Sequence, residues 1–145
     1  MAVTGFWYGN AFKSAFNKEI DLDTDVLKVM LCTSAYTPNQ DTHQYKSSIT
    51  GEVVGTGYTA GGATLTSPTV VYTAGTNTFV LDAADVSWPT STITARYAVI
   101  YDSSPASDAT RPLIAYVDFG ADVVSTAGTF SITWDAAGIC AVTVA

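Results

Sequence analysis

The sequence predicts a mainly β protein: an antiparallel β-sandwich, or a barrel-like sheet, of short strands with one N-terminal α-helix. Three observations predict this fold. Runs of β-branched and aromatic residues recur roughly every 8–12 residues, turn residues separate them, and a helical apolar period occurs only near the N-terminus. With 145 residues and neither an internal repeat nor a linker, the chain is expected to form one domain, 1–145.

The helix is expected over residues 5–20. Tyr8, Phe12 and Phe16 recur at every fourth position, and Thr4 is placed to cap the first turn. An aromatic stripe of this kind either covers the sheet of its own domain or contacts a partner subunit.

The first predicted strand covers residues 26–33, where Leu27, Val29 and Leu31 alternate with other side chains. A different connection lies on each side of it. An acidic turn precedes it. After it, residues 34–50 form a long polar loop, which is either a contact arm or a plain surface excursion. The glycine-rich residues 51–62 are expected to contain a short strand around 52–54 and a flexible turn at 55–62.

The strongest strand signals lie at Thr92–Tyr101 and Pro112–Phe119, separated by a polar loop at 102–111. Both faces of both strands carry apolar side chains, so this hairpin is expected inside the sheet and not at its edge. The remaining short strands are predicted at 63–66, 69–73, 78–81, 86–88, 122–125, 129–134 and 139–144.

Composition excludes some partners. Thirteen acidic against six basic residues give a net charge of −7, which disfavours binding to nucleic acid and to anionic membranes. We see no secretory signal and no apolar run of the length that a membrane helix needs. Charged residues make up only 13% of the chain, which favours a surface partly covered in an assembly; a monomer kept soluble by hydroxyl groups is the alternative.

Catalytic, cofactor and metal signatures are not recognised, so we expect no enzyme. Residues 21–25 begin like a calcium loop, but Val26 and Cys32 stand where that loop needs Gly and Glu. His43, the single histidine, is interpreted as a loop residue. Cys32 and Cys140 are expected to be buried free thiols, with a bridge between them as the alternative.

Several segments resemble small virion proteins of tailed bacteriophages. They are A-F-N-K-E-I-D-L-D-T-D-V-L-K-V-M-L-C-T-S-A-Y-T-P-N-Q-D-T-H at 15–43, G-T-G-Y-T-A-G-G-A-T-L at 55–65, S-T-I-T-A-R-Y-A-V-I-Y-D at 91–102, P-L-I-A-Y-V-D-F-G at 112–120 and F-S-I-T-W-D at 130–135. The resemblance spans nearly the whole chain in the same order, and no catalytic residues come with it.

The resemblance implies a non-enzymatic virion component, made in the host cytoplasm, that binds the major capsid protein or other virion proteins. A capsid decoration or cement protein is the first hypothesis, with a homo-oligomer, a trimer by analogy, as its form. A tail-associated host-recognition or carbohydrate-binding module is the alternative, and it predicts exposed aromatic side chains around Trp88 or Tyr58. The interface candidates are the N-terminal aromatics and the residues of the long loop: Phe6, Trp7, Tyr8, Phe12, Tyr36, His43 and Tyr45.

Overall fold

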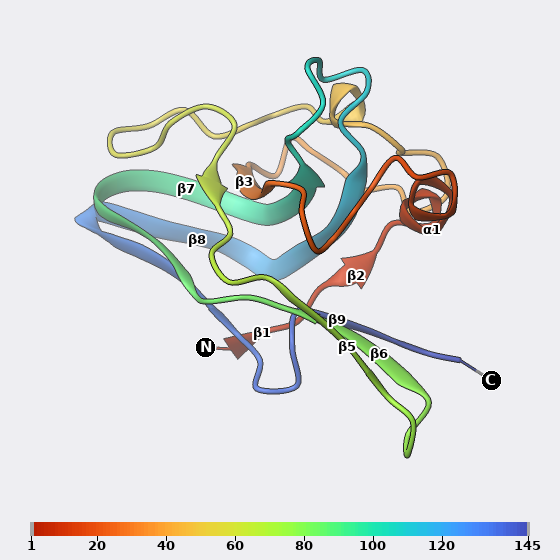
Figure 1. Cartoon of the computed structure of the whole chain (residues 1–145). Coiled ribbons are helices and arrows are strands. Elements are labelled where there is room, and N and C mark those ends of the chain that lie inside the picture. Colours follow the sequence, from red (N-terminus) through yellow and green to blue (C-terminus); the bar gives the residue numbers. More distant parts are fainter. Residues whose placement is uncertain (1, 145) are drawn as a thin grey trace.

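The computed structural model describes residues 2–144 and confirms a mainly β fold with one N-terminal helix (Figure 1). The strands form two open sheets that stack in a sandwich-like arrangement. In chain order the elements are β1 (Ala2–Val3), β2 (Phe6–Trp7), α1 (Gly9–Phe16), β3 (Leu27–Cys32), the 3₁₀ turn η1 (Lys46–Ser48), β4 (Ala63–Thr64), β5 (Thr69–Thr73), β6 (Thr78–Asp82), β7 (Val86–Asp102), β8 (Leu113–Trp134) and β9 (Cys140–Thr143).

The predicted hairpin forms the middle of the larger sheet, as expected. Strand order there is β1-β8-β7-β3-β4, with β2 pairing on β8. Val99 on β7 lies opposite Met30 on β3 and opposite Tyr116 on β8. The smaller sheet contains β5, β6 and β9 in the order β5-β6-β9, and all its pairs are antiparallel.

The prediction of many short strands is wrong for β7 and β8, which are 17 and 22 residues long. The strands predicted at 86–88 and 129–134 stop next to Pro89 and Gly128, yet pairing continues past both residues. The ladder accommodates them through register shifts, including one between Trp88 and Ser91, and such irregularities bend strands without ending them.

Apolar side chains cover both faces of the larger sheet, which explains why its central strands show no polar face. On one face Val29, Ile100 and Val117 pack with Leu81 and Cys140 of the smaller sheet. On the other face Met30, Val99 and Leu113 pack with Tyr8, Ala11 and Tyr36. Helix α1 and the long loop therefore cover the side of the larger sheet that the smaller sheet leaves open.

The helix is shorter than predicted. Thr4 does not cap it: Phe6 and Trp7 instead pair with Tyr116 and Ala115 on β8, and the helix begins at Gly9 without a side-chain cap. It ends at Phe16 because Lys18 adopts a left-handed backbone conformation, with a φ of 63°. Pairing with β8 thus outweighs the local helical period of residues 5–8.

The long loop is a fixed cover and not a free arm. Tyr36 is 1% exposed, and Tyr45 forms an isolated bridge with Pro112. The glycine-rich turn is also closely packed: at Gly62, with a φ of 79°, a Cβ atom would collide with the backbone of Val29. Glycine is therefore needed there for close approach to β3 as well as for its backbone conformation.

Cys32 and Cys140 are buried free thiols, as predicted, and they belong to the two different core clusters. Burial raises the pKa of each to about 12. Within residues 2–144, α1 is too short to cross a membrane.

Candidate protein-binding groove

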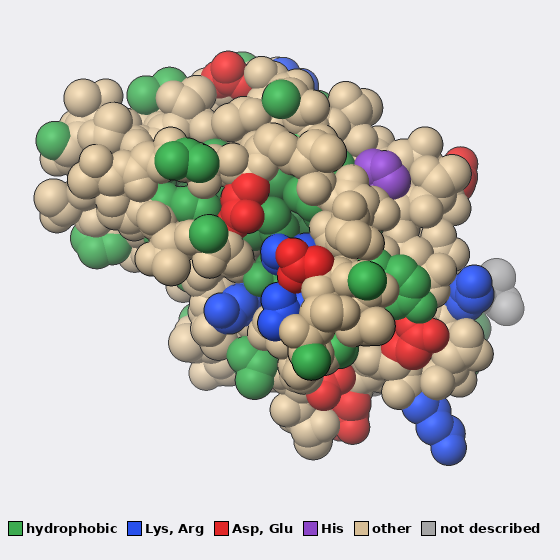
Figure 2. Space-filling model, turned by 90° about the horizontal axis from the view of Figure 1, so that it is seen from above, with side chains coloured by type: hydrophobic (Ala, Val, Ile, Leu, Met, Phe, Trp, Pro, Cys, Tyr) green, Lys and Arg blue, Asp and Glu red, His purple; other side chains and the backbone are tan. Residues whose placement is uncertain are grey.

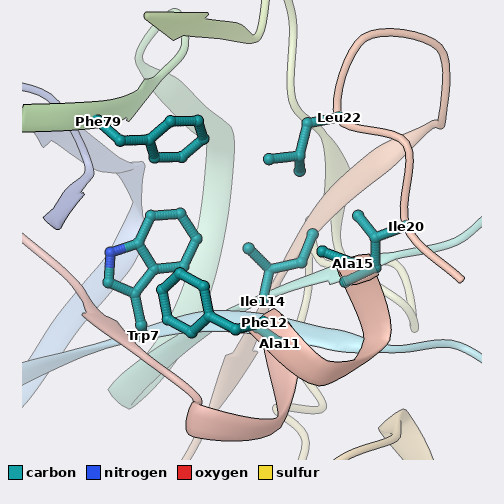
Figure 3. Close-up of a pocket in the computed structure, with 8 residues that line it drawn as sticks. All are labelled: Trp7, Ala11, Phe12, Ala15, Ile20, Leu22, Phe79 and Ile114. Carbon is teal, nitrogen blue, oxygen red and sulfur yellow. The ribbon is translucent and has the colours of Figure 1, made fainter. Parts of the chain in front are cut away.

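An apolar groove runs between α1 and the smaller sheet; we call it the α1 groove. Its inner part is shown in Figure 3, where Phe12 of α1, Trp7 of β2 and Phe79 of β6 converge on one cavity. The ring centres of Trp7 and Phe12 are 5.3 Å apart, and those of Trp7 and Phe79 are 6.1 Å apart. Ala11, Ala15, Ile20, Leu22 and Ile114 complete the inner part, while Phe16, Tyr72, Val142, Thr143 and Val144 line its outer part.

The outer part of the groove exposes large apolar side chains. Phe16 is 87% exposed, Val144 57% and Tyr72 54%. These three residues come from the end of α1, the C-terminal segment and β5, yet they line one surface. A contiguous exposed apolar surface on a protein marks a site of contact with another molecule, whereas single exposed apolar residues do not.

Two hydrogen bonds hold the N-terminal segment of the groove against the smaller sheet. The indole N–H of Trp7 donates to the carbonyl of Ala141 on β9 over 3.0 Å, and the N–H of Gly5 donates to the carbonyl of Ile139. Gly5 is required there because a Cβ atom would lie 2.9 Å from Sγ of Cys140. The N-terminal segment thus joins the two sheets at the floor of the groove.

The structure separates the predicted interface residues into three groups. Trp7 and Phe12 line the α1 groove, and Phe6 is 53% exposed beside Tyr116. Tyr8 and Tyr36 are 0% and 1% exposed, so their assignment as interface residues is wrong. They fill the space between the larger sheet and its cover. His43 and Tyr45 are half-buried in the cover itself and lie outside the groove.

The most exposed residues of the groove were not among the predicted interface residues. Phe16 belongs to the aromatic stripe of the predicted helix. It is the last residue of α1 and is exposed, and its exposure depends on where the helix ends. Tyr72, Phe79 and Val142 were interpreted only as strand residues. One sequence signal was available: residues 53–81 and 136–144 contain no charged side chain, and these segments supply one whole wall of the groove.

Tyr8, Tyr36 and His43 form a buried hydrogen-bond chain instead of an interface. The hydroxyl oxygens of Tyr8 and Tyr36 are 2.7 Å apart, and the Tyr36 hydroxyl lies 2.9 Å from Nδ1 of His43. The N–H of Asn39 also donates to this Nδ1, so the atom accepts and the proton of neutral His43 resides on Nε2. Burial raises the pKa of Tyr36 to about 12 and lowers the pKa of His43.

A second hollow, polar in character, gathers three of the six basic residues of the chain: Lys28, Lys46 and Arg111. Asp108 bridges two of them, with 2.8 Å from its oxygens to Nζ of Lys46 and to Nη1 of Arg111. These cations hold the pKa of Asp108 below its usual value. Charged side chains of both signs lie together near the centre of the face in Figure 2. The Lys46–Asp108 pair connects η1 to the loop between β7 and β8, and the Arg111–Asp108 pair lies within that loop.

The acidic turn is organised by its own side chains. Oδ2 of Asp25 accepts from the N–H of Asp21 over 2.6 Å, and Oδ1 of Asp21 accepts from the N–H of Asp23. Among residues 2–144, no three His, Cys, Asp or Glu side chains are grouped closely enough to hold a metal ion.

The aromatic platform expected of a carbohydrate-binding module is not at Trp88. Its side chain is 5% exposed and makes an edge contact with Phe130, at 5.9 Å between ring centres. Tyr58 is half-buried, and its hydroxyl accepts from the N–H of Leu31 and donates to Glu52. Trp88 therefore packs in the core, and Tyr58 covers the edge of β3.

Comparison with protein families, curated proteins and solved structures finds no match for this chain.

Proposed function

We propose that this protein is a non-enzymatic structural component of a tailed bacteriophage particle, a capsid decoration protein that binds and stabilises the head shell. The observation that carries the proposal is the exposed α1 groove, because a contiguous exposed apolar surface marks a site of contact with another molecule. The resemblance of the sequence segments to virion proteins supplies the class of partner. The major capsid protein, or another virion protein, is the proposed occupant.

The groove has the composition of a protein-binding site. Phe16, Tyr72 and Val144 offer large apolar areas, and the aromatic rings lose little rotamer freedom on burial. Trp7 and Phe12 already lie fixed against one another, so the inner part of the groove is formed before a partner arrives.

Deletion of the N-terminal residues would be a poor test. Tyr8 is fully buried and Phe6 and Trp7 pair with β8, so the deletion would remove part of the core together with the groove. Phe16→Ser is the better probe, because its side chain is almost wholly exposed. Val54→Ser is the matched control, since Val54 is 98% exposed and lies outside the groove.

The test is rebinding of each purified variant to particles of the source phage that have been stripped of the protein. Phe16→Ser should weaken binding by about 30-fold, as loss of an interface hot spot does, while Val54→Ser should bind like the natural protein. Equal binding by both variants would show that the groove is not the attachment site.

Antibody-labelled electron microscopy of purified virions tests the location. Label over the heads is the expected result. Label confined to the tail would support the host-recognition alternative, and unlabelled virions would contradict a role in the particle.

A further inference from the structure

The smaller sheet has one edge that the chain closes and one that it leaves open. At the β9 edge, Gly5 donates to the carbonyl of Ile139 and Trp7 donates to the carbonyl of Ala141. At the β5 edge, no backbone hydrogen bond from the described residues reaches Thr69–Tyr72 apart from the ladder with β6. In Figure 1 the β5–β6 hairpin extends away from the body of the molecule.

The β5 edge also lacks the features that normally prevent strands from pairing between molecules. It has five residues in unbroken register with β6, and Thr69–Thr73 contains no Pro and no charged residue. The long strands β7 and β8 also have free stretches of edge, but register shifts interrupt them and Asp118 and Asp122 lie on β8. The edge of β3 is covered by β4 and by Tyr58.

The sequence of β5 is complementary to itself. It reads Thr-Val-Val-Tyr-Thr. If two such strands pair antiparallel about Val71, Thr69 lies opposite Thr73 of the second copy, Val70 lies opposite its Tyr72, and Val71 lies opposite its Val71. Thr–Thr pairs and pairs of an aromatic with a β-branched residue are among those that stabilise antiparallel sheets.

Burial supports the same pairing. Val71 and Tyr72 point to opposite faces of the sheet, and each is 54% exposed, so apolar surface remains open on both faces of β5. Tyr72 and Val70 lie on the groove side, because they pair with Phe79 and Leu81. Pairing about Val71 brings Tyr72 of each copy beside Val70 of the other and closes apolar surface on both molecules.

Charge is compatible with a second copy as the occupant. Each copy carries a net charge of −7, and the repulsion between two copies is smallest where their contact surfaces carry no charged side chain. Residues 53–81 contain no charged side chain and include all of β5.

We propose that two copies of this chain associate through β5, in antiparallel register about Val71, to form one continuous sheet across a two-fold axis. Strands that add to an open sheet edge gain main-chain hydrogen bonds, and an isologous contact of this kind closes after two copies. The proposal does not rest on the role in the phage particle, because it concerns the purified chain alone; Tyr72 takes part in the pairing and also lines the outer part of the α1 groove.

The first test is sedimentation of the purified chain over a concentration series. The natural chain should form a dimer of the 15.2 kDa protomer. Val71→Lys should weaken the dimer by tenfold or more, about 1.4 kcal/mol, because like charges then face each other across the axis. Val54→Lys adds the same charge at a residue 98% exposed and should leave the dimer unchanged. A natural chain that stays monomeric, or a Val71→Lys chain that stays dimeric, overturns the proposal.

The second test fixes the register by disulfide formation. Val71→Cys should cross-link two copies under mild oxidation, because residues directly opposite in an antiparallel pair have Cα atoms about 4.5–5.5 Å apart. Thr69→Cys alone should not, since its two copies would lie about 14 Å apart along the strands. A mixture of the Thr69→Cys and Thr73→Cys chains should cross-link. Cross-linking by Thr69→Cys alone refutes the register. Cys32 and Cys140 are buried and do not compete.

The outcomes separate this proposal from the proposed function. A monomer in solution whose antibody label covers phage heads would refute the pairing and leave the decoration role standing. A cross-linked dimer with unlabelled virions would support the pairing and refute the decoration role. Protection of the β5 edge by an extended segment of another protein, with no dimer, would also refute the pairing.

Discussion

Replacement of Tyr36 by phenylalanine tests whether the buried hydrogen-bond chain holds the long loop onto the larger sheet. The hydroxyl of Tyr36 lies between the hydroxyl of Tyr8 at 2.7 Å and Nδ1 of His43 at 2.9 Å. Because Nδ1 of His43 accepts, Tyr36 donates to His43 and accepts from Tyr8. Burial of Tyr8 and its hydrogen bond with Tyr36 raise the pKa of Tyr8 far above its ordinary value, so its hydroxyl keeps its proton.

The cost of each change follows from which hydroxyl is left without a partner. Tyr36→Phe strands the buried hydroxyl of Tyr8 and should cost about 1–3 kcal/mol. Tyr8→Phe leaves Tyr36 bonded to His43 and should cost about 0.5–1.5 kcal/mol. In the double variant no hydroxyl is stranded at Tyr8, so its cost should be less than the sum of the single costs, by at least about 0.5 kcal/mol.

Urea unfolding followed by tryptophan fluorescence measures these costs. With a slope of about 2 kcal/mol per molar urea, a loss of about 2 kcal/mol lowers the midpoint by about 1 M. Tyr72→Phe is the control, because Tyr72 is 54% exposed and its hydroxyl bonds only to Asn77 at the surface. Strictly additive costs, or a Tyr36→Phe midpoint equal to that of the control, would refute the reasoning.

Three further predictions concern titration and burial. The pKa of folded His43 lies below the ordinary value of 6.5, so the unfolded chain binds more protons as pH falls through 6.5; stability should drop there, and His43→Asn should flatten that part of a pH series of urea midpoints. Asp102 is 1% exposed, its Oδ2 accepts no hydrogen bond from residues 2–144, and burial raises its pKa above 3.8. The charged carboxylate therefore costs stability that grows as pH rises through this pKa, so Asp102→Asn should raise the melting temperature at pH 7 and gain little near pH 3. Phe130 is 3% exposed and Phe16 is 87% exposed, so Phe130→Ala should lose about 3–5 kcal/mol and Phe16→Ala less than about 1 kcal/mol in urea unfolding; equal losses would contradict the burial pattern.

The fold was predictable where a local pattern decides the structure. Alternation along Thr92–Tyr101, with apolar side chains on both faces, correctly placed that strand inside the sheet. The predicted helix was too long at its N-terminal end, because it included Phe6 and Trp7, which pair with β8. A long-range contact of this kind leaves no local signal in the sequence. Pro89 and Gly128 do not end their strands, because a bulge in the ladder accommodates either residue.

The candidate site was only partly predictable, for a related reason. Trp7 and Phe12 were selected as aromatic residues near the N-terminus, and they do line the groove. Tyr8, their neighbour, is buried, because the backbone turns from β2 into α1 at that residue and directs its side chain to the sheet. Whether an aromatic side chain is exposed depends on which segment covers it, and the course of the long loop cannot be derived from its composition.

Trp7 connects the two surfaces that we assign to association. Its ring forms a wall of the α1 groove, and its indole N–H occupies the carbonyl of Ala141 and so closes the β9 edge. Because the N-terminal segment occupies the carbonyls of Ile139 and Ala141, β5 is the more open edge of the smaller sheet. A second copy at β5 borders the outer part of the groove, where Tyr72 lies, but no residue of β5 lines the inner part. The inner groove, framed by Trp7 and Phe12, therefore stays open to another partner after two copies have joined.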